Sequence, residues 1–343
     1  MTMATLTYLL TGALLMCSMI LNATVWRVNN QGYSADFTGS PGVSALQQAI
    51  NDDSVEPGDT LHLEASPTDY GNVEVNKPLV IIGPGYFLDE NTTPQLQNNA
   101  NMAMIAQLYF PVTSSGSRVS GISQLNLGNT GHVTYIEAND IVISRSRMRA
   151  VVLQGTGLNN VVLTQNYIDE YFITSNISIT GLTVRNNRAA SIALSAASQG
   201  DVSHNVFFDG ASVFSPIQFY NNIIRGGSVA ENNNTAANVH HNILSSSPTW
   251  LSGSTNHLGL APVQVFSTAN PTPDGSLQTL PAGSCGVCHT GGLNGGGIGM
   301  FFGAQPCILS GIPAIPAIFK LWANGSAVQG DNLPVTIGTR SND

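Results

Sequence analysis

A short phrase recurs between about residues 139 and 244: an apolar residue, two mostly polar residues, Asn, any residue, and then an apolar or small residue. It occurs at 162–168, 183–189, 201–207, 218–224 and 238–244, and at 143–148 Ser takes the place of Asn. The residues in this place are Ser146, Asn166, Asn187, Asn205, Asn222 and Asn242, separated by 20, 21, 18, 17 and 20 residues. Such regular spacing indicates a structural repeat.

A period near twenty residues is too short for helical repeats, and the phrase lacks the leucine pattern of horseshoe repeats. It is typical of a parallel β-helix, in which successive coils pair strand on strand about 4.8 Å apart. The same place in each phrase would then stack in a column. Asn tolerates the left-handed conformation of a bend, and stacked amides can hydrogen-bond from rung to rung. We therefore predict an asparagine ladder; the alternative is a loop-rich protein in which Asn merely marks turns.

The length and charge of the chain limit its organisation and partners. With 343 residues it is long enough for one large or two ordinary domains, and the continuous repeat favours one elongated body. Charged residues make up 9%, with 11 Lys and Arg against 20 Asp and Glu, which gives a net charge of −9. This balance provides no basic surface for nucleic acid, so no nucleic-acid partner is predicted.

The first 23 residues hold an apolar stretch from Leu9 to Leu21. We interpret it as a signal peptide cleaved near Ala23, although no positively charged region precedes it. About 13 apolar residues are few for a membrane span, so none is predicted after cleavage. A lipid anchor on Cys17 is the alternative, but Met16 is bulky where a lipoprotein box has a small residue. We expect a secreted protein that is extracellular or on the outer cell surface.

A short helix is predicted at 44–53, with Ser44 as its N-cap and Ala45, Ala49 and Ile50 on one side. Such a helix would cover the open end of the coil and protect its exposed edge. A turn at 57–59 then leads into strands with alternating apolar residues.

These N-terminal stretches also carry a family resemblance. The segments ALQQAIN, PGDTLHL and YGNVEVNKPLVIIGPG resemble the cap and first coil of secreted right-handed parallel β-helix proteins of the pectate-lyase-like superfamily. The likeness covers about 40–245, and the tail is similar in style to the ending of β-helix proteins from Bacteroidetes-like bacteria, in a branch without assigned function. Because the superfamily includes lyases, hydrolases, esterases and adhesins, the resemblance implies the fold and leaves the activity open.

The predicted fold class is all-β: a single-stranded right-handed parallel β-helix with a short N-terminal capping helix and a small C-terminal β segment. The hand follows from the resemblance and from the general preference of parallel crossovers. The expected organisation is a signal peptide at 1–23, the capped β-helix at 24–265, a Pro/Gly-rich final coil and connector at 266–303, and a C-terminal β segment at 304–343.

One outward patch is the candidate ligand-binding site. The residue after the Asn column is Arg147, Tyr167 and Arg188 in three consecutive coils, and three places after the column come Arg149 and then Asp169. Alternation along an extended strand would direct both rows outward and gather these five residues together. Tyr167 between two Arg would form a stacking platform for a sugar. A solvated face with a few charge pairs is the alternative.

The resemblance also implies what an enzyme would need. In lyases of the superfamily, an Arg or Lys removes a proton beside a uronate carboxylate that Ca²⁺ acidifies, and in its hydrolases paired Asp residues act as acid and base. Neither signature is matched here. If the chain is a polysaccharide lyase or glycoside hydrolase, Arg147, Arg188 and Asp169 are the catalytic candidates. The leading prediction is a non-catalytic protein that binds polysaccharide or builds surface structure.

The motif CGVCH, from Cys285 to His289, has the spacing of a c-type haem site. Cys285 and Cys288 would bond the vinyl groups and His289 would ligate the iron, with Met300 available as an axial ligand. The surrounding glycines do not favour the helix that cytochromes place there. Zinc held with the help of Cys307 is a second alternative, and a disulfide or free thiols are the third. No cofactor is therefore assigned, and an electron-transfer protein with haem on CGVCH remains an alternative function.

Two histidines, His204 and His241, precede ladder residues and fall in one column. Solvent-facing turn residues account for them, so no metal site is predicted from the sequence.

Overall fold

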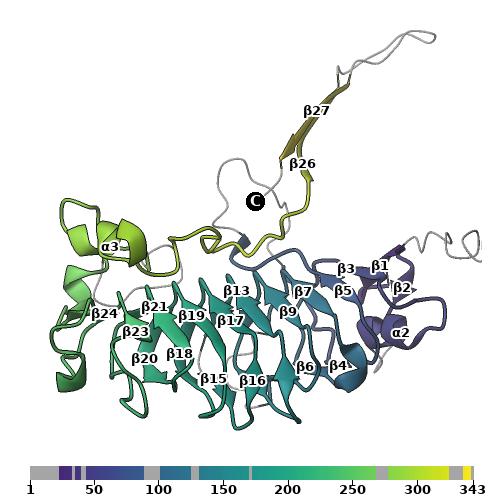
Figure 1. Cartoon of the computed structure of the whole chain (residues 1–343). Helices are drawn as coiled ribbons and strands as arrows, with labels where there is room; N and C mark the ends of the chain where they lie inside the picture. The colour runs from purple at the N-terminus through teal and green to yellow at the C-terminus, as the bar shows by residue number, and fades with distance from the viewer. Residues whose placement is uncertain are drawn as a thin grey trace, which may run out of the picture.

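The computed structural model describes residues 23–32, 35–39, 44–88, 101–124, 131–169, 172–267, 277–323 and 335–340. Two long sheets of parallel strands wind around a common axis as a parallel β-helix of about eight turns. In Figure 1 the axis runs from α2, at the N-terminal end, towards α3. A small antiparallel hairpin follows the coil. The all-β fold with a capping helix and a C-terminal β segment is confirmed, whereas the predicted signal peptide at 1–23 lies almost wholly outside the described residues.

The first sheet has eleven strands. In sheet order they are β2 (Phe37–Thr38), β1 (Val25–Asn29), β3 (Thr60–Leu63), β5 (Val80–Ile82), β7 (Arg118–Ser120), β9 (Val142–Ser144), β13 (Val162–Thr164), β17 (Leu182–Arg185), β19 (Gly200–Ser203), β21 (Gln218–Tyr220) and β23 (Val239–His240).

The second sheet has twelve strands. Its main order is β25 (His257–Leu258), β24 (Ile243–Leu244), β22 (Ile223–Ile224), β20 (Val206–Ser212), β18 (Arg188–Ala193), β15 (Phe172–Ser175), β11 (Val151–Leu153), β8 (Thr134–Ile136), β6 (Gln107–Phe110) and β4 (Asn72–Glu74). Beside this row, β10 (Arg147–Met148) pairs with β14 (Tyr167–Ile168), which also pairs with β18. A third, two-stranded sheet joins β12 (Leu158–Asn159) and β16 (Ile179–Thr180). Short 3₁₀ turns occur at Val112–Ser114, Thr249–Leu251, Pro262–Gln264 and Leu293–Gly295.

Helix α2 (Ala45–Asn51) covers the N-terminal end of the coil, as predicted. The side chain of Ser44 accepts a hydrogen bond from the main-chain N–H of Gln47 at 3.2 Å, which caps the first turn. Ala45, Leu46, Ala49 and Ile50 are buried beneath the helix. The opposite face of α2 is polar, with Gln47 half-buried and Asn51 exposed.

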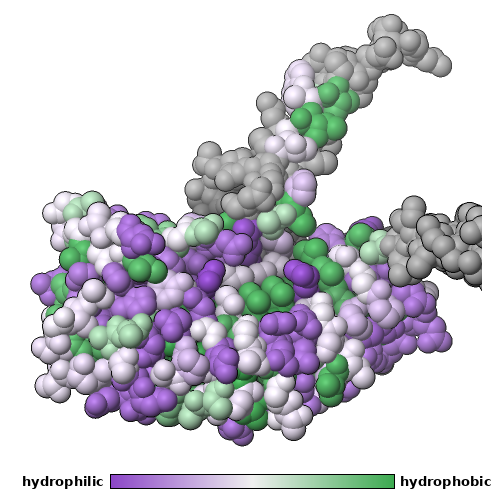
Figure 2. Space-filling view, viewed as in Figure 1, coloured by the Kyte–Doolittle hydropathy of each residue, from purple (hydrophilic) through white to green (hydrophobic). Residues whose placement is uncertain are grey.

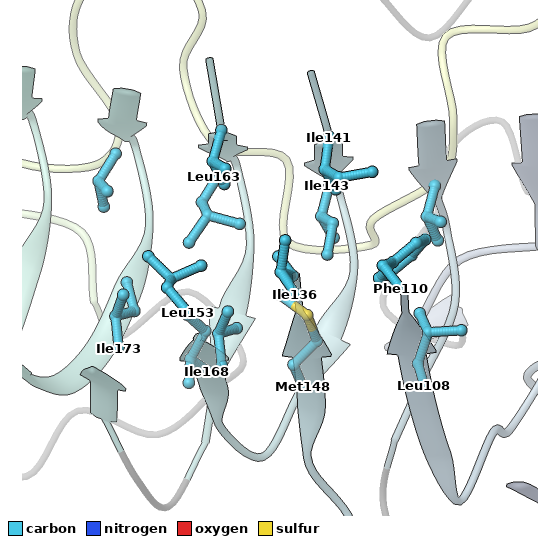
Figure 3. Close-up of a cluster of buried hydrophobic side chains, with 14 of the residues drawn as sticks. Leu108, Phe110, Ile136, Ile141, Ile143, Met148, Leu153, Leu163, Ile168 and Ile173 are labelled. Carbon is cyan, nitrogen blue, oxygen red and sulfur yellow. The ribbon is translucent and has the colours of Figure 1, made fainter. Parts of the chain in front are cut away.

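The core of the coil is a narrow column of aliphatic side chains between the sheets. Figure 3 shows Ile143 and Leu163 from the first sheet facing Ile136 and Leu153 from the second, and all four are fully buried. In the three-residue strand β9 only the middle residue is buried, because alternate side chains point to opposite sides.

The asparagine ladder is confirmed in every predicted rung. The Oδ1 atom of each ladder Asn accepts the main-chain N–H of the preceding rung at 2.9 or 3.0 Å. Its Nδ2 donates to the carbonyl three residues before that rung at 2.8 to 3.0 Å. Asn256, which the repeat spacing did not indicate, forms a seventh rung after Asn242. The ladder therefore satisfies main-chain groups that would otherwise be buried without partners.

One detail of the predicted ladder is corrected. The left-handed conformation belongs to the residue before each rung, at φ of 45° to 57° in Arg145, Gln165, Asn186, His204, Asn221 and His241, and the ladder residues themselves do not adopt it. We call these six residues the bend column. Because the bend turns their side chains away from the core, the bend column becomes a row of outward polar groups along the molecule.

After β25 the chain does not add another strand to the coil sheets within the described residues, and residues 268–276 of the expected final coil and connector at 266–303 lie outside them. The chain forms α3 (Gly286–Thr290) and then runs back along the coil towards the N-terminal end (Figure 1). We call residues 277–312 the return segment. The chain ends in a hairpin of β26 (Ala317–Ala323) and β27 (Val335–Arg340). This hairpin projects from the coil and carries a hydrophobic patch in Figure 2, where Trp322, Val335 and Ile337 are exposed.

Candidate functional site

The predicted patch assembles but is covered. Arg147, Tyr167 and Arg188 are paired in register on β10, β14 and β18, and Asp169 lies 2.6 Å from Arg147 Nη2. However, Tyr167 is only 3% exposed, and the side chains of both Arg residues are 12% exposed. Arg149 is buried as well. The prediction of an open stacking platform is therefore wrong, although its residues do come together.

Aromatic rings from outside the predicted patch provide the cover. Arg147 lies over the ring of Phe87 at 4.6 Å and 5.8 Å from that of Tyr167. Arg188 lies between Tyr167 at 4.9 Å and Phe208 at 4.4 Å, and Arg225 follows over Phe208. The alternation of cations and rings stabilises neighbouring coils against one another. Phe87, from a loop distant in sequence, could not be predicted from the repeat.

The return segment is attached to the coil by the bend column. Arg145 Nη1 donates to the carbonyl of Ile312 at 3.0 Å and Gln165 Nε2 to that of Pro306 at 2.5 Å. Further along the axis, Asn221 Oδ1 accepts the main-chain N–H of Leu293 at 2.8 Å. An apolar cluster that includes Val206, Ile223, Ile243, Ile298 and Met300 fills the space beneath. The segment is thus an integral layer of the fold.

The CGVCH motif lies in this layer at α3. Cys285 and Cys288 form a disulfide, and Cys288 is fully buried. The His289 ring nitrogen lies 2.8 Å from the carbonyl of Leu280, and the ring packs against Phe302. Cys307 is a buried free thiol, and burial raises its pKa to about 12.

This arrangement does not fit the cofactors considered for the motif. Haem attachment would require both sulfurs as thioethers, whereas here they bond to each other. For zinc, no three His, Cys, Asp or Glu side chains of the described residues are grouped so that they could hold a metal ion. We therefore derive no chemistry from haem or zinc at Cys285, Cys288 and His289.

A polar cavity of about 360 Å³ lies where the return segment meets the first sheet. It is lined by Arg185, Asn186, Ser203, His204, Tyr220, Ala304 and Gln305. Its charged groups are largely engaged with one another: Asp201 pairs with Arg185 at 3.1 Å and accepts from Ser203 Oγ at 2.6 Å. The pKa of Tyr220 is raised by burial and by its hydrogen bond to Asp201. This network leaves few groups for a ligand.

A larger cavity, of about 500 Å³, opens at the N-terminal end between α2 and the second sheet. It is lined by Gln47, Asn51, Asn72, Val73, Glu74, Asn76, Gln107 and Tyr109. Five of these eight residues carry side-chain amides, and none is Lys or Arg. We call it the amide pocket.

Helix α2 and the sheet edge hold the amide pocket together. Strand β4 ends the second sheet, and Gln47 covers its edge by accepting from the Glu74 N–H at 2.7 Å and donating to the Glu74 carbonyl at 3.1 Å. Asn51 Oδ1 accepts from Gln47 at 3.1 Å and from Asn76 at 3.2 Å. The side-chain amides of Asn72 and Gln107 have no hydrogen-bond partner among the described residues, and both residues line the cavity.

Tyr109 extends the amide pocket along the sheet. Its hydroxyl donates to Glu137 Oε2 at 2.7 Å, and Gln154 Nε2 donates to Glu137 Oε1 at 2.8 Å. The pKa of Tyr109 is raised by the hydrogen bond to Glu137 and, more weakly, by the charge of Glu74. Tyr135 is the next residue in register on β8. Two tyrosines and two carboxylates therefore adjoin the amides on one face.

The sequence contained a signal for the amide pocket that the repeat argument did not use. Gln47 and Asn51 lie on the side of α2 opposite Ala45 and Ala49, and alternation directs Asn72 and Glu74 outward from β4. The sequence did not predict that α2 packs beside β4. This packing brings the two polar faces together.

No helix of the described residues is long and apolar enough to cross a membrane. Compared with known proteins, the chain matches no protein-family model, no curated protein and no solved structure.

Proposed function

We propose that this chain is a secreted or cell-surface protein that binds an uncharged polysaccharide without cleaving it, and that the amide pocket is its binding site. The β-helix and its capping helix support a place in the pectate-lyase-like superfamily, in a branch without assigned function. The apolar N-terminal stretch and the disulfide between Cys285 and Cys288 are in keeping with export to an oxidising compartment.

The observation that carries the proposal is the chemistry of the amide pocket. A sugar hydroxyl both donates and accepts, and a side-chain amide offers a donor and an acceptor side by side. Asn72 and Gln107 present such unsatisfied amides at the opening, on neighbouring strands and in register. Tyr109 and Tyr135 add ring surface beside them, which suits the C–H face of a sugar.

The charges around the amide pocket favour an uncharged ligand. Glu137 and Glu74 both raise the pKa of Tyr109, and the described residues that line the cavity include no Lys or Arg. The whole chain carries a net charge of −9. A polymer of acidic sugars would meet like charges here, which is unfavourable at short range. Uncharged glycans should therefore bind in preference to uronates.

Binding can be tested with a glycan array on the chain from Thr24 onward, followed by titration of the glycans that bind. The double substitution Asn72→Ala and Gln107→Ala removes two amides without breaking an intramolecular bond, and we expect about tenfold weaker binding. Gln218→Ala, on an exposed position of the first sheet, is the matched control. Absence of any bound glycan, or equal binding by the double variant, would refute the proposal.

A second function, glycoside hydrolysis, is favoured by one observation: the two carboxylates Glu74 and Glu137 flank one tyrosine. Paired carboxylates are what hydrolysis of a glycosidic bond requires. The glycans that bind should be incubated with the protein and assayed for new reducing ends. Stable binding without products supports the binding function, and turnover abolished by Glu137→Gln would replace it with hydrolysis.

A further inference from the structure

Two consecutive histidines form an unusual contact at the C-terminal end of the first sheet. His240 is the last residue of β23, and His241 follows in the bend column with φ of 52°. In a continuous strand two successive side chains would point to opposite sides. The left-handed bend instead turns them towards each other, and their Nδ1 atoms lie 2.9 Å apart.

We propose that His240 and His241 form a binding site for a divalent transition metal, with Cu²⁺ as the best match. Two imidazole nitrogens bound to one metal at about 2.0 Å each, in adjacent positions, are separated by about 2.9 Å. The two Nδ1 atoms already lie at that separation, and a rotation of the rings would direct both lone pairs at one metal ion. Imidazole is a preferred ligand of copper, and two adjacent nitrogens suit its square-planar geometry. A zinc site would need a third protein ligand.

The surroundings fix both rings while leaving them accessible. The ring of His240 stacks on Tyr220 at 5.4 Å with an angle of 16°, and Thr255 Oγ1 lies 3.4 Å from His241 Nδ1. Both histidines are half-buried, so water can complete the coordination of the metal. Stacking on Tyr220 thus holds the plane of the His240 ring. The contact of Thr255 Oγ1 with His241 Nδ1 holds the second ring in the metal-free protein and would give way to the metal.

One carboxylate nearby favours a cation: the charge of Asp201 raises the pKa of His240. The charge of His257 works in the opposite direction, because it lowers the pKa of His241. Burial lowers the pKa of both His240 and His241, which favours the neutral rings that a metal binds. In the metal-free pair the Nδ1–H of one ring donates a hydrogen bond to the Nδ1 of the other. On metal binding this proton moves to Nε2 of the same ring, and both Nδ1 lone pairs become available.

Copper binding should be measured with tag-free protein and CuCl₂, by calorimetry and by electron paramagnetic resonance at pH 7.5. We expect one Cu²⁺ per chain with a nitrogen-ligated spectrum, and at least about tenfold weaker binding in His240→Gln and in His241→Asn. Asn retains the left-handed bend at 241, so that variant should fold. His62→Ala, which removes a histidine from β3 at the other end of the same sheet, should bind copper normally.

Three outcomes would overturn the site: no stoichiometric copper binding, unchanged binding in both variants, or loss of binding in His62→Ala. Circular dichroism melting curves of the variants separate loss of a ligand from loss of the fold. Glycan binding at the amide pocket should be the same with and without copper, because the metal site stands independently of that proposal.

Discussion

Asn186 Nδ2 donates a hydrogen bond of 2.9 Å to the main-chain carbonyl of Met300, across 114 residues of sequence. The same amide also donates to Phe302 at 2.6 Å. Asn186 is 2% exposed and adopts φ of 54°. One residue of the bend column therefore serves both the turn of the coil and the attachment of the return segment.

Replacing Asn186 by Gly should loosen the return segment while preserving the bend, since Gly adopts positive φ without strain. Loss of two buried hydrogen bonds should cost about 2 kcal/mol in free energy of unfolding. Cys307, at present buried, should then react faster with a thiol reagent. Asn160→Gly is the matched control, because Asn160 also has a positive φ but bonds to Asp140. Equal thiol reactivity in wild type and Asn186→Gly would contradict this role.

The asparagine ladder should dominate the stability of the coil. Asn187→Ala would leave the Asn166 N–H and the Leu163 carbonyl buried without their partners, and would leave a cavity. We expect a loss of about 3 kcal/mol in the free energy of unfolding, measured by urea denaturation. Asn159→Ala, on an exposed position of the short strand β12, should change it by about 0.5 kcal/mol. Similar losses in both variants would argue against a special role for the ladder.

The coil could be predicted because its signal is local and repeated. Every ladder residue from Ser146 to Asn222 meets the next rung about twenty residues away, so position within the phrase alone determines its neighbours. The repeat spacing did not predict the rung at Asn256, because Asn256 follows Asn242 after only 14 residues.

The cover over the predicted patch depends on contacts that no repeat encodes. Phe87 reaches Arg147 across 60 residues, and the return segment lies on the side of the coil where the sequence pattern indicated open solvent. The alternation rule correctly placed Tyr167 outside the core of the coil. It could not show that a second layer would bury the same side chain, because that layer is specified by residues far along the chain.

The cysteines permit a chemical test of the haem alternative. A chain beginning at Thr24, produced under oxidising conditions, should show no Soret band and should expose one reactive thiol after denaturation, that of Cys307. In the native state this thiol should be unreactive, because burial raises its pKa to about 12 and the thiolate is the reactive form. Cys307→Ser is the control for assignment. A Soret band, or three reactive thiols without reductant, would contradict the disulfide.

His204 should make the stability of the protein sensitive to mild acid. Asn221 Oδ1 accepts the Leu293 N–H, so its Nδ2 faces His204 Nε2 at 3.1 Å, and that nitrogen must accept. Burial lowers the pKa of His204, the charge of Arg185 lowers it further, and Asp201 opposes them. A protonated ring would lose this hydrogen bond and face Arg185.

Because the folded state binds this proton less readily than the unfolded state, the stabilisation by neutral His204 is present above about pH 6.5 and is lost as the pH falls below it. The urea midpoint should therefore drop between pH 7.5 and pH 5. The drop should be smaller in His204→Asn, which keeps the left-handed bend but cannot titrate. Gln305→Ala changes the same cavity without removing a titratable group and should retain the full drop. An equal drop in wild type and His204→Asn would show that other groups, such as His62 or the His240 and His241 pair, govern the response to acid.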